Sequence, residues 1–65
     1  MGQLDDLTFR VEQWDANGNL EAVISASAEL TVARAAFKAA VERPPGQMIL
    51  LRQKTRVIEQ SGGKL

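Results

Sequence analysis

The side chains of this sequence that could do chemistry are carboxylates, lysines, arginines and hydroxyls, because the chain has no histidine, cysteine or tyrosine. Those three residue types supply most of the acid–base and nucleophilic groups that work near neutral pH. Asp5 and Asp6 are adjacent, and on an extended chain neighbouring side chains point to opposite sides, which spoils a paired-carboxylate site. We therefore predict no enzymatic activity, no catalytic residue and no cofactor.

The acidic and amide residues from Asp15 to Glu21 resemble the oxygen-rich start of a calcium loop. The match fails on position, since the glycine is Gly18 where the EF-hand pattern needs it at position 20, and the twelfth position is Ala26. Asp, Asn and Gly are also the ordinary residues of tight turns. The segment predicts a hairpin turn with at least one positive φ at Asn17-Gly18, and no metal site.

A nucleic-acid interface is the alternative function suggested by four basic residues. Arg52, Lys54 and Arg56 recur at every second position, and Arg43 stands at the end of the predicted helix. Such a row could follow a phosphate backbone. However, no aromatic residue is interleaved with it, and charges on an edge strand also protect a sheet against aggregation. We favour the protective interpretation over nucleic-acid binding.

Length and composition predict one small domain, residues 1–65, with residues 1–6 as a leader and 61–65 as a tail. A chain of 65 residues hides only ~60% of the surface that it exposes when unfolded, so its stability is marginal. Without cysteine there is no disulfide to add, and oligomerisation is the remaining route.

The formal net charge is zero, but acidic residues dominate before residue 43 and basic residues dominate from there on. We interpret this asymmetry as attraction between the two halves across a fold or a dimer. No apolar run approaches the ~20 residues needed to span a bilayer, and the acidic start is unlike a signal peptide. The expected location is the cytoplasm, with no membrane partner.

The first half of the chain predicts a hairpin followed by a helix. Residues 7–12 alternate between apolar and polar types, which places Trp14 on the polar face. In the return strand, Leu20 and Ile24 are expected on one face and Val23 on the other. A helix is predicted over 28–43, with Ser25 or Ser27 as N-cap and Glu29 in its first turn. Its buried stripe contains Leu30, Ala33, Phe37, Ala40 and Val41.

The second half of the chain predicts two more strands. Pro44-Pro45-Gly46 stops the helix. The unbroken apolar run in 47–51 indicates a strand buried on both faces, and 56–60 is the last strand. The fold class is therefore α+β, a ββαββ chain with a four-stranded antiparallel sheet of order 2-1-3-4 and the helix on one face. The main alternative joins the last two strands into one long bent strand.

The stretch Ala33 to Phe37, followed by Pro45-Gly46, Leu51-Arg52 and 56–58, resembles a pattern in short uncharacterised bacterial ββαββ proteins of this length. The resemblance covers roughly the C-terminal two thirds and contains no chemically specific motif. It implies a bacterial or environmental source and no assigned activity, so no functional residue is carried over.

The function expected first is a small self-associating interaction module, because one helix covers only one face of a sheet. A homodimer is expected first and a tetramer second. A third hypothesis is a small-ligand site in an apolar cleft between subunits, near Trp14. The interface is expected on the uncovered face, with these residues: Trp14, Val23, Ile49, Leu51 and Ile58.

Overall fold

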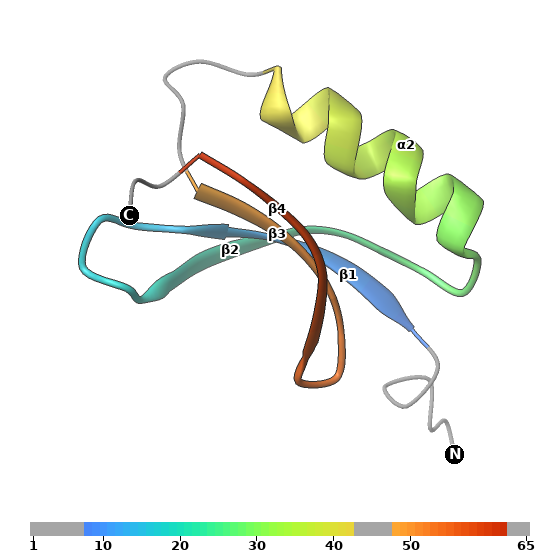
Figure 1. The fold of residues 1–65 in the computed structure, drawn as a ribbon, viewed down its shortest axis with the longest axis horizontal. Helices are drawn as coiled ribbons and strands as arrows, with labels where there is room; N and C mark the ends of the chain where they lie inside the picture. The colour runs from blue at the N-terminus through green and yellow to red at the C-terminus, as the bar shows by residue number, and fades with distance from the viewer. Residues whose placement is uncertain (1–7, 43–47, 63–65) are drawn as a thin grey trace.

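The structure is a computed structural model that describes residues 8–42 and 48–62. Its elements are β1 (Phe9–Trp14), β2 (Leu20–Ser27), α2 (Leu30–Val41), β3 (Met48–Gln53) and β4 (Arg56–Ser61) (Figure 1). The strands form one antiparallel sheet of order β2-β1-β3-β4. The predicted α+β fold, with its ββαββ order and strand order 2-1-3-4, is confirmed, and the alternative of one bent final strand is wrong.

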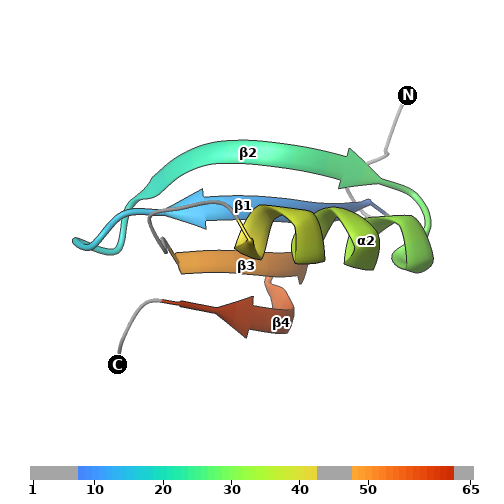
Figure 2. The same cartoon turned by 90° about the horizontal axis from the view of Figure 1, so that it is seen from above.

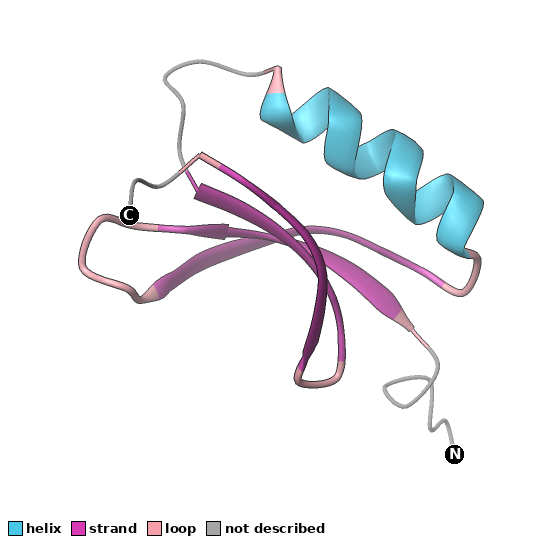
Figure 3. Ribbon diagram, viewed as in Figure 1, coloured by secondary structure: helices cyan, strands magenta, loops and turns pink. Residues whose placement is uncertain are grey.

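Helix α2 lies along one face of the sheet and packs on β1, β2 and β3 (Figures 2 and 3). It begins at Leu30 and ends at Val41, inside the predicted 28–43. Neither predicted N-cap is correct, because β2 runs as far as Ser27 and Glu29 occupies the cap position without a side-chain bond. Ser27 instead fixes the approach to the helix: its Oγ accepts from the Glu29 N–H at 3.1 Å and donates to the Glu29 carbonyl at 3.2 Å.

The core lies between α2 and the sheet. Its buried members are Val11, Ala33, Phe37, Ala40, Ile49 and Leu51, and the partly buried residues Phe9, Ile24, Leu30, Ala36, Val41 and Ile58 pack against them. This confirms that the helix docks through its predicted stripe. Strands β1 and β3 supply the centre of the core because they are the two inner strands of the sheet.

The two hairpin turns use different residues to reach the left-handed backbone region. In the first, Oδ1 of Asp15 accepts the N–H groups of Asn17 and Asn19, both at 2.9 Å. Gly18 has φ +86°, which confirms the predicted positive φ. In the second, Lys54 has φ +58° in a turn without glycine. That conformation is uncommon for a residue with a Cβ, and the sequence did not indicate it.

Register shifts, the mark of β-bulges, interrupt both edge strands. Strand β2 has two against β1, at Val11/Glu12 and at Gln13/Trp14, and β4 has one against β3, at Leu51/Arg52. Bulges bend a strand and change which face its side chains take. As a result Leu20 pairs with Trp14 and Val23 pairs with Glu12, which places Leu20 and Val23 on one face and corrects their predicted placement on opposite faces. The curvature of β2 is visible in Figure 2.

Candidate interaction surface

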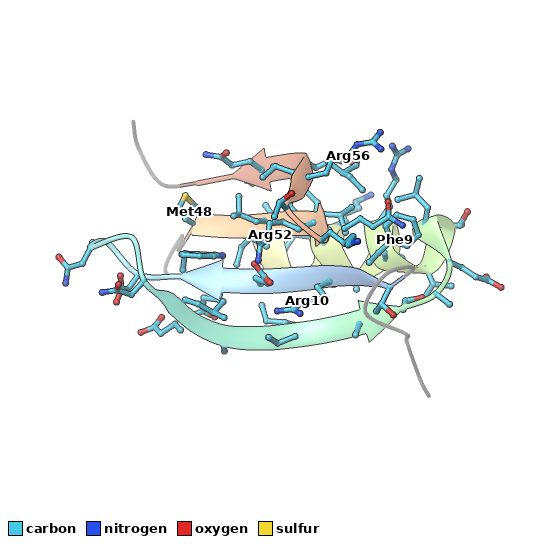
Figure 4. All side chains as sticks on the ribbon, turned by 90° about the horizontal axis from the view of Figure 1, so that it is seen from below. Phe9, Arg10, Met48, Arg52 and Arg56 are labelled. Atoms are coloured by element: carbon cyan, nitrogen blue, oxygen red, sulfur yellow. The ribbon has the colours of Figure 1, made fainter. Side chains whose placement is uncertain are left out.

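The face of the sheet opposite α2 is not covered by any element in the described ranges 8–42 and 48–62 (Figure 4). Side chains of directly paired residues point to the same side of a sheet, so the register assigns each residue to a face. Because Val11 and its partner Leu51 lie in the core, the residues alternating with them lie on the other side. We call this surface the open face; its members are Arg10, Glu12, Trp14, Leu20, Val23, Ala26, Met48, Leu50, Arg52, Val57 and Gln60.

A group of charged side chains occupies the middle of the open face. Glu12 has an exposed fraction of 0%, although it lies on the uncovered side of the sheet. Arg52 holds its carboxylate with two bonds, from Nε to Oε1 at 2.8 Å and from Nη2 to Oε2 at 3.1 Å. Arg10 Nη2 lies 3.0 Å from Oε2, and Trp14 Nε1 donates to Oε1 at 3.1 Å. We call these four residues the Glu12 cluster.

The geometry of the Glu12 cluster favours the ionised carboxylate. Burial alone raises the pKa of Glu12, because a charge is less stable away from water. The hydrogen bonds from Arg52 and Trp14 and the positive charges of Arg52 and Arg10 outweigh that effect, and the pKa of Glu12 lies below its ordinary value. The Arg52 guanidinium also lies 5.8 Å from the centroid of the Trp14 ring, within the range of a cation–π contact.

Glu12 compensates the repulsion between two neighbouring arginines. Arg10 and Arg52 are direct cross-strand partners, and like charges in that position destabilise a sheet. The Glu12 carboxylate bridges both guanidinium groups and removes most of this repulsion. One positive charge is left over, and Arg10 Nε is a buried nitrogen for which the structure gives no hydrogen-bond partner among the residues it describes.

Apolar side chains flank the Glu12 cluster on both sides. The described residues include four large hydrophobic side chains that are exposed, and three of them lie on the open face: Leu20 at 44%, Val23 at 49% and Val57 at 48%. The fourth, Val32 at 51%, is on the helix. Leu20 and Val23 belong to β2 and Val57 to β4, the two edge strands. The exposed apolar side chains therefore stand at the edges of the sheet, and the charged ones stand at its centre. Most protein interfaces have the opposite arrangement, with an apolar core and a polar rim.

The structure corrects three of the five predicted interface residues. Trp14 and Val23 are on the open face, but Ile49 and Leu51 lie in the core under the helix, and Ile58 packs against that core. An unbroken apolar run such as Met48 to Leu51 does not reveal which of its residues face the helix. The pairing of β3 with β1 decides it, and puts Met48 and Leu50 on the open face.

The predicted basic row is not formed by the described residues. Arg52 pairs with Val57 and is bound to Glu12 on the open face, whereas Arg56 pairs with Gln53, which points to the other side. Figure 4 shows Arg52 near the middle of the sheet and Arg56 at its edge. Lys54 lies in the turn, and Arg43 is outside the described residues. The turn breaks the alternation that the spacing suggested, because it pairs Arg56 with Gln53 and not with Arg52.

Sequence reasoning missed Arg10 and Glu12, which the structure places at the centre of the site. Both stand on the polar face of the first strand, where charged residues are ordinary. The bond that makes Glu12 unusual comes from Arg52, 40 residues further along the chain. Within this strand, the only sequence feature that could have pointed to a site on the polar face was Trp14, which lies on the same face.

A groove of about 360 Å³ lies between the C-terminal half of α2 and the end of β4. Phe37 and Val41 are among the residues that line it. Arg34 and Glu59 also line it and form an ion pair, with Nε 3.1 Å from Oε2. Trp14, where a ligand cleft was hypothesised, does not line this groove.

Comparisons with protein-family models, with curated proteins and with solved structures found no match to this chain. Among the described residues, no helix is long and apolar enough to cross a bilayer.

Proposed function

We propose that this chain is a non-enzymatic interaction module that associates with a second copy of itself through the open face. One observation carries the proposal: three of the four exposed large hydrophobic side chains in the described part of the chain lie on the side of the sheet opposite α2. Exposed apolar side chains gathered on one surface are typical of association sites, whereas scattered ones need no explanation.

The form of the sheet edges supports a face-to-face arrangement over edge-to-edge pairing. A strand edge recruits another chain through a straight row of unpaired backbone groups. Strand β2 has two register shifts and β4 has one, so neither edge is regular along its length. Bulges of this kind discourage strand addition. The open face is then the remaining sheet surface for a partner.

A second copy fits the extent of this face. Strands about 4.8 Å apart, with a rise of about 3.3 Å per residue, give a four-stranded sheet of this length a plan area of roughly 400 Å². This plan area is about half of the roughly 800 Å² per partner of a standard interface. We therefore expect a twofold dimer with a dissociation constant in the micromolar range, about 10 µM or weaker.

Sedimentation velocity between about 10 µM and about 1 mM tests the proposal, because this range spans the expected dissociation constant. We expect the average mass to rise from monomer toward dimer with concentration. Val23→Lys adds a positive charge beside the two arginines of the open face and should keep the chain monomeric. Val32→Lys is the matched control, since Val32 is similarly exposed at 51% but lies on the helix. A parent chain that stays monomeric at about 1 mM in both chloride and phosphate would overturn the proposal.

A further inference from the structure

The charge at the centre of the open face sets a condition on any dimer that forms there. The Glu12 cluster contains two guanidinium groups and one carboxylate, so it carries one net positive charge. The other described members of the open face are uncharged. Glu12 and Arg10 are on β1 and Arg52 is on β3, the two inner strands. A twofold axis near the middle of the sheet therefore brings the two clusters close together.

Two such clusters cannot be buried against each other without a compensating charge. Removing an unbalanced charge from water is costly, and two positive charges facing each other add their repulsion. The described open face has no carboxylate other than Glu12, which is already bound by Arg52 and Arg10. A second copy thus brings the same excess of positive charge and cannot neutralise the first. No described residue of the open face supplies the missing negative charge, and an anion from the solution can.

We propose that an oxyanion of the phosphate or sulfate class binds between the two copies and bridges the Arg10 and Arg52 guanidinium groups of both. The proposal rests on the proposed dimer. Guanidinium groups present planar, paired N–H donors that match the oxygen atoms of phosphate, sulfate and carboxylate. Arg10 contacts Glu12 through Nη2, its side chain is 35% exposed, and its Nε has no hydrogen-bond partner among the described residues. Because Nε is covered from solvent, the guanidinium must turn slightly for an anion over Arg10 to give this nitrogen an acceptor.

The experiment compares self-association in inorganic phosphate, in sulfate and in chloride at matched ionic strength, by sedimentation velocity. In phosphate and sulfate we expect the dimer dissociation constant to be about tenfold lower than in chloride, a shift well resolved by this measurement. NMR of the arginine side chains should show the Nε–H resonance of Arg10 moving during a phosphate titration, while that of Arg34 stays in place.

Two variants separate a site from a general salt effect. Phosphate and sulfate also strengthen apolar association by being excluded from protein surfaces, and that effect does not depend on Arg10. Arg10→Gln should have the same dissociation constant in phosphate as in chloride. Arg34→Gln should keep the preference, because Arg34 pairs with Glu59 in the groove beside α2.

The outcomes are distinct. Equal dimerisation in chloride and phosphate overturns the anion site and leaves the dimer standing. An oxyanion preference that survives Arg10→Gln also overturns the site. A monomer in every salt overturns the dimer and the anion site together.

Discussion

Side chains on the two faces of this sheet are kept from water in different ways. The face under α2 is apolar, and its residues are hidden by a helix whose Phe37 and small alanines fit against Val11, Ile49 and Leu51. The open face has a buried charge at its centre, and Glu12 is hidden by the side chains of its own neighbours, Arg10, Arg52 and Trp14. The difference shows that a residue on an uncovered face can be fully buried without a second layer. Its burial depends on long, amphipathic side chains that lie over it.

Phe37→Ala should have the largest effect on stability, because it removes the largest side chain from the core under the helix. We expect a loss of about 3–5 kcal/mol in the free energy of unfolding, comparable with the whole stability of so small a domain. Chemical denaturation followed by circular dichroism measures it. Val32→Ala, on the exposed side of the same helix, should change stability by less than about 0.5 kcal/mol. A cooperative Phe37→Ala variant with an unchanged midpoint would remove Phe37 from the core.

Glu12→Gln should have the next largest effect, because it leaves two adjacent arginines without their carboxylate. We expect a loss of about 2–3 kcal/mol, less than for a fully enclosed pair because Arg10 and Arg52 are in part exposed to water. Glu59→Gln removes a second carboxylate that the described part of the chain pairs with an arginine, but this pair is well exposed to solvent and its loss should cost less than about 1 kcal/mol. Equal effects of the two substitutions would contradict the special role of the Glu12 cluster.

The pH dependence of stability also distinguishes Glu12 from the other carboxylates. Because the pKa of Glu12 is lower in the folded chain than its ordinary value, its contribution is fully present above the unfolded pKa, about 4.3. The contribution is lost as the pH falls through the lower folded pKa. Stability should therefore fall below about pH 4, and the fall should be shallower in Glu12→Gln. Thermal unfolding between about pH 2 and pH 7 measures both curves. Parallel curves for the two proteins would show that other carboxylates cause the acid sensitivity.

The smallest effects are expected in the two turns, where the backbone conformation is similar and the residue is not. Gly18→Ala places a Cβ at φ +86° and should cost about 1 kcal/mol, although nothing lies within 4 Å of that Cβ. Lys54→Gly relieves the same strain at φ +58° and should leave stability unchanged or raise it by about 0.5 kcal/mol. Denaturation midpoints measure both. A loss of stability in Lys54→Gly would show that the Lys54 side chain contributes more than its backbone strain costs.

The apolar pattern was enough to predict the buried side of the helix. The three- and four-residue spacing of Leu30, Ala33, Phe37 and Val41 identified the side of α2 that is buried, and the turn residues around Gly18 located the first hairpin. Local patterns of this kind depend only on the period of the element that contains them. The strand order followed from alternating directions and short connections.

The open face could not be predicted in the same way, because its composition depends on pairing. Bulges in β2 changed the phase of the alternation, so Leu20 joined Val23. In β4 the pairing of Val57 with Arg52 decided which of two neighbours faces the helix, and it is Ile58. The Met48 to Leu51 run contained no polar residue to mark its phase. The Glu12 cluster depends on a bond across 40 residues of sequence, and no local property of Glu12 distinguishes it from an exposed strand glutamate.

The Glu12 cluster also makes an incorrect alignment of β3 with β1 energetically unfavourable. A slip of β3 by one residue against β1 would move Arg52 to the helix side, under Phe37, and would carry Leu51 to the open side. A purely apolar run tolerates such an error at little cost, because the residues on its two faces are equivalent. Here the misaligned sheet would bury an arginine among hydrocarbon and leave Glu12 without its partner. The charged side chains therefore discriminate between alignments that the apolar residues of β3 alone would accept.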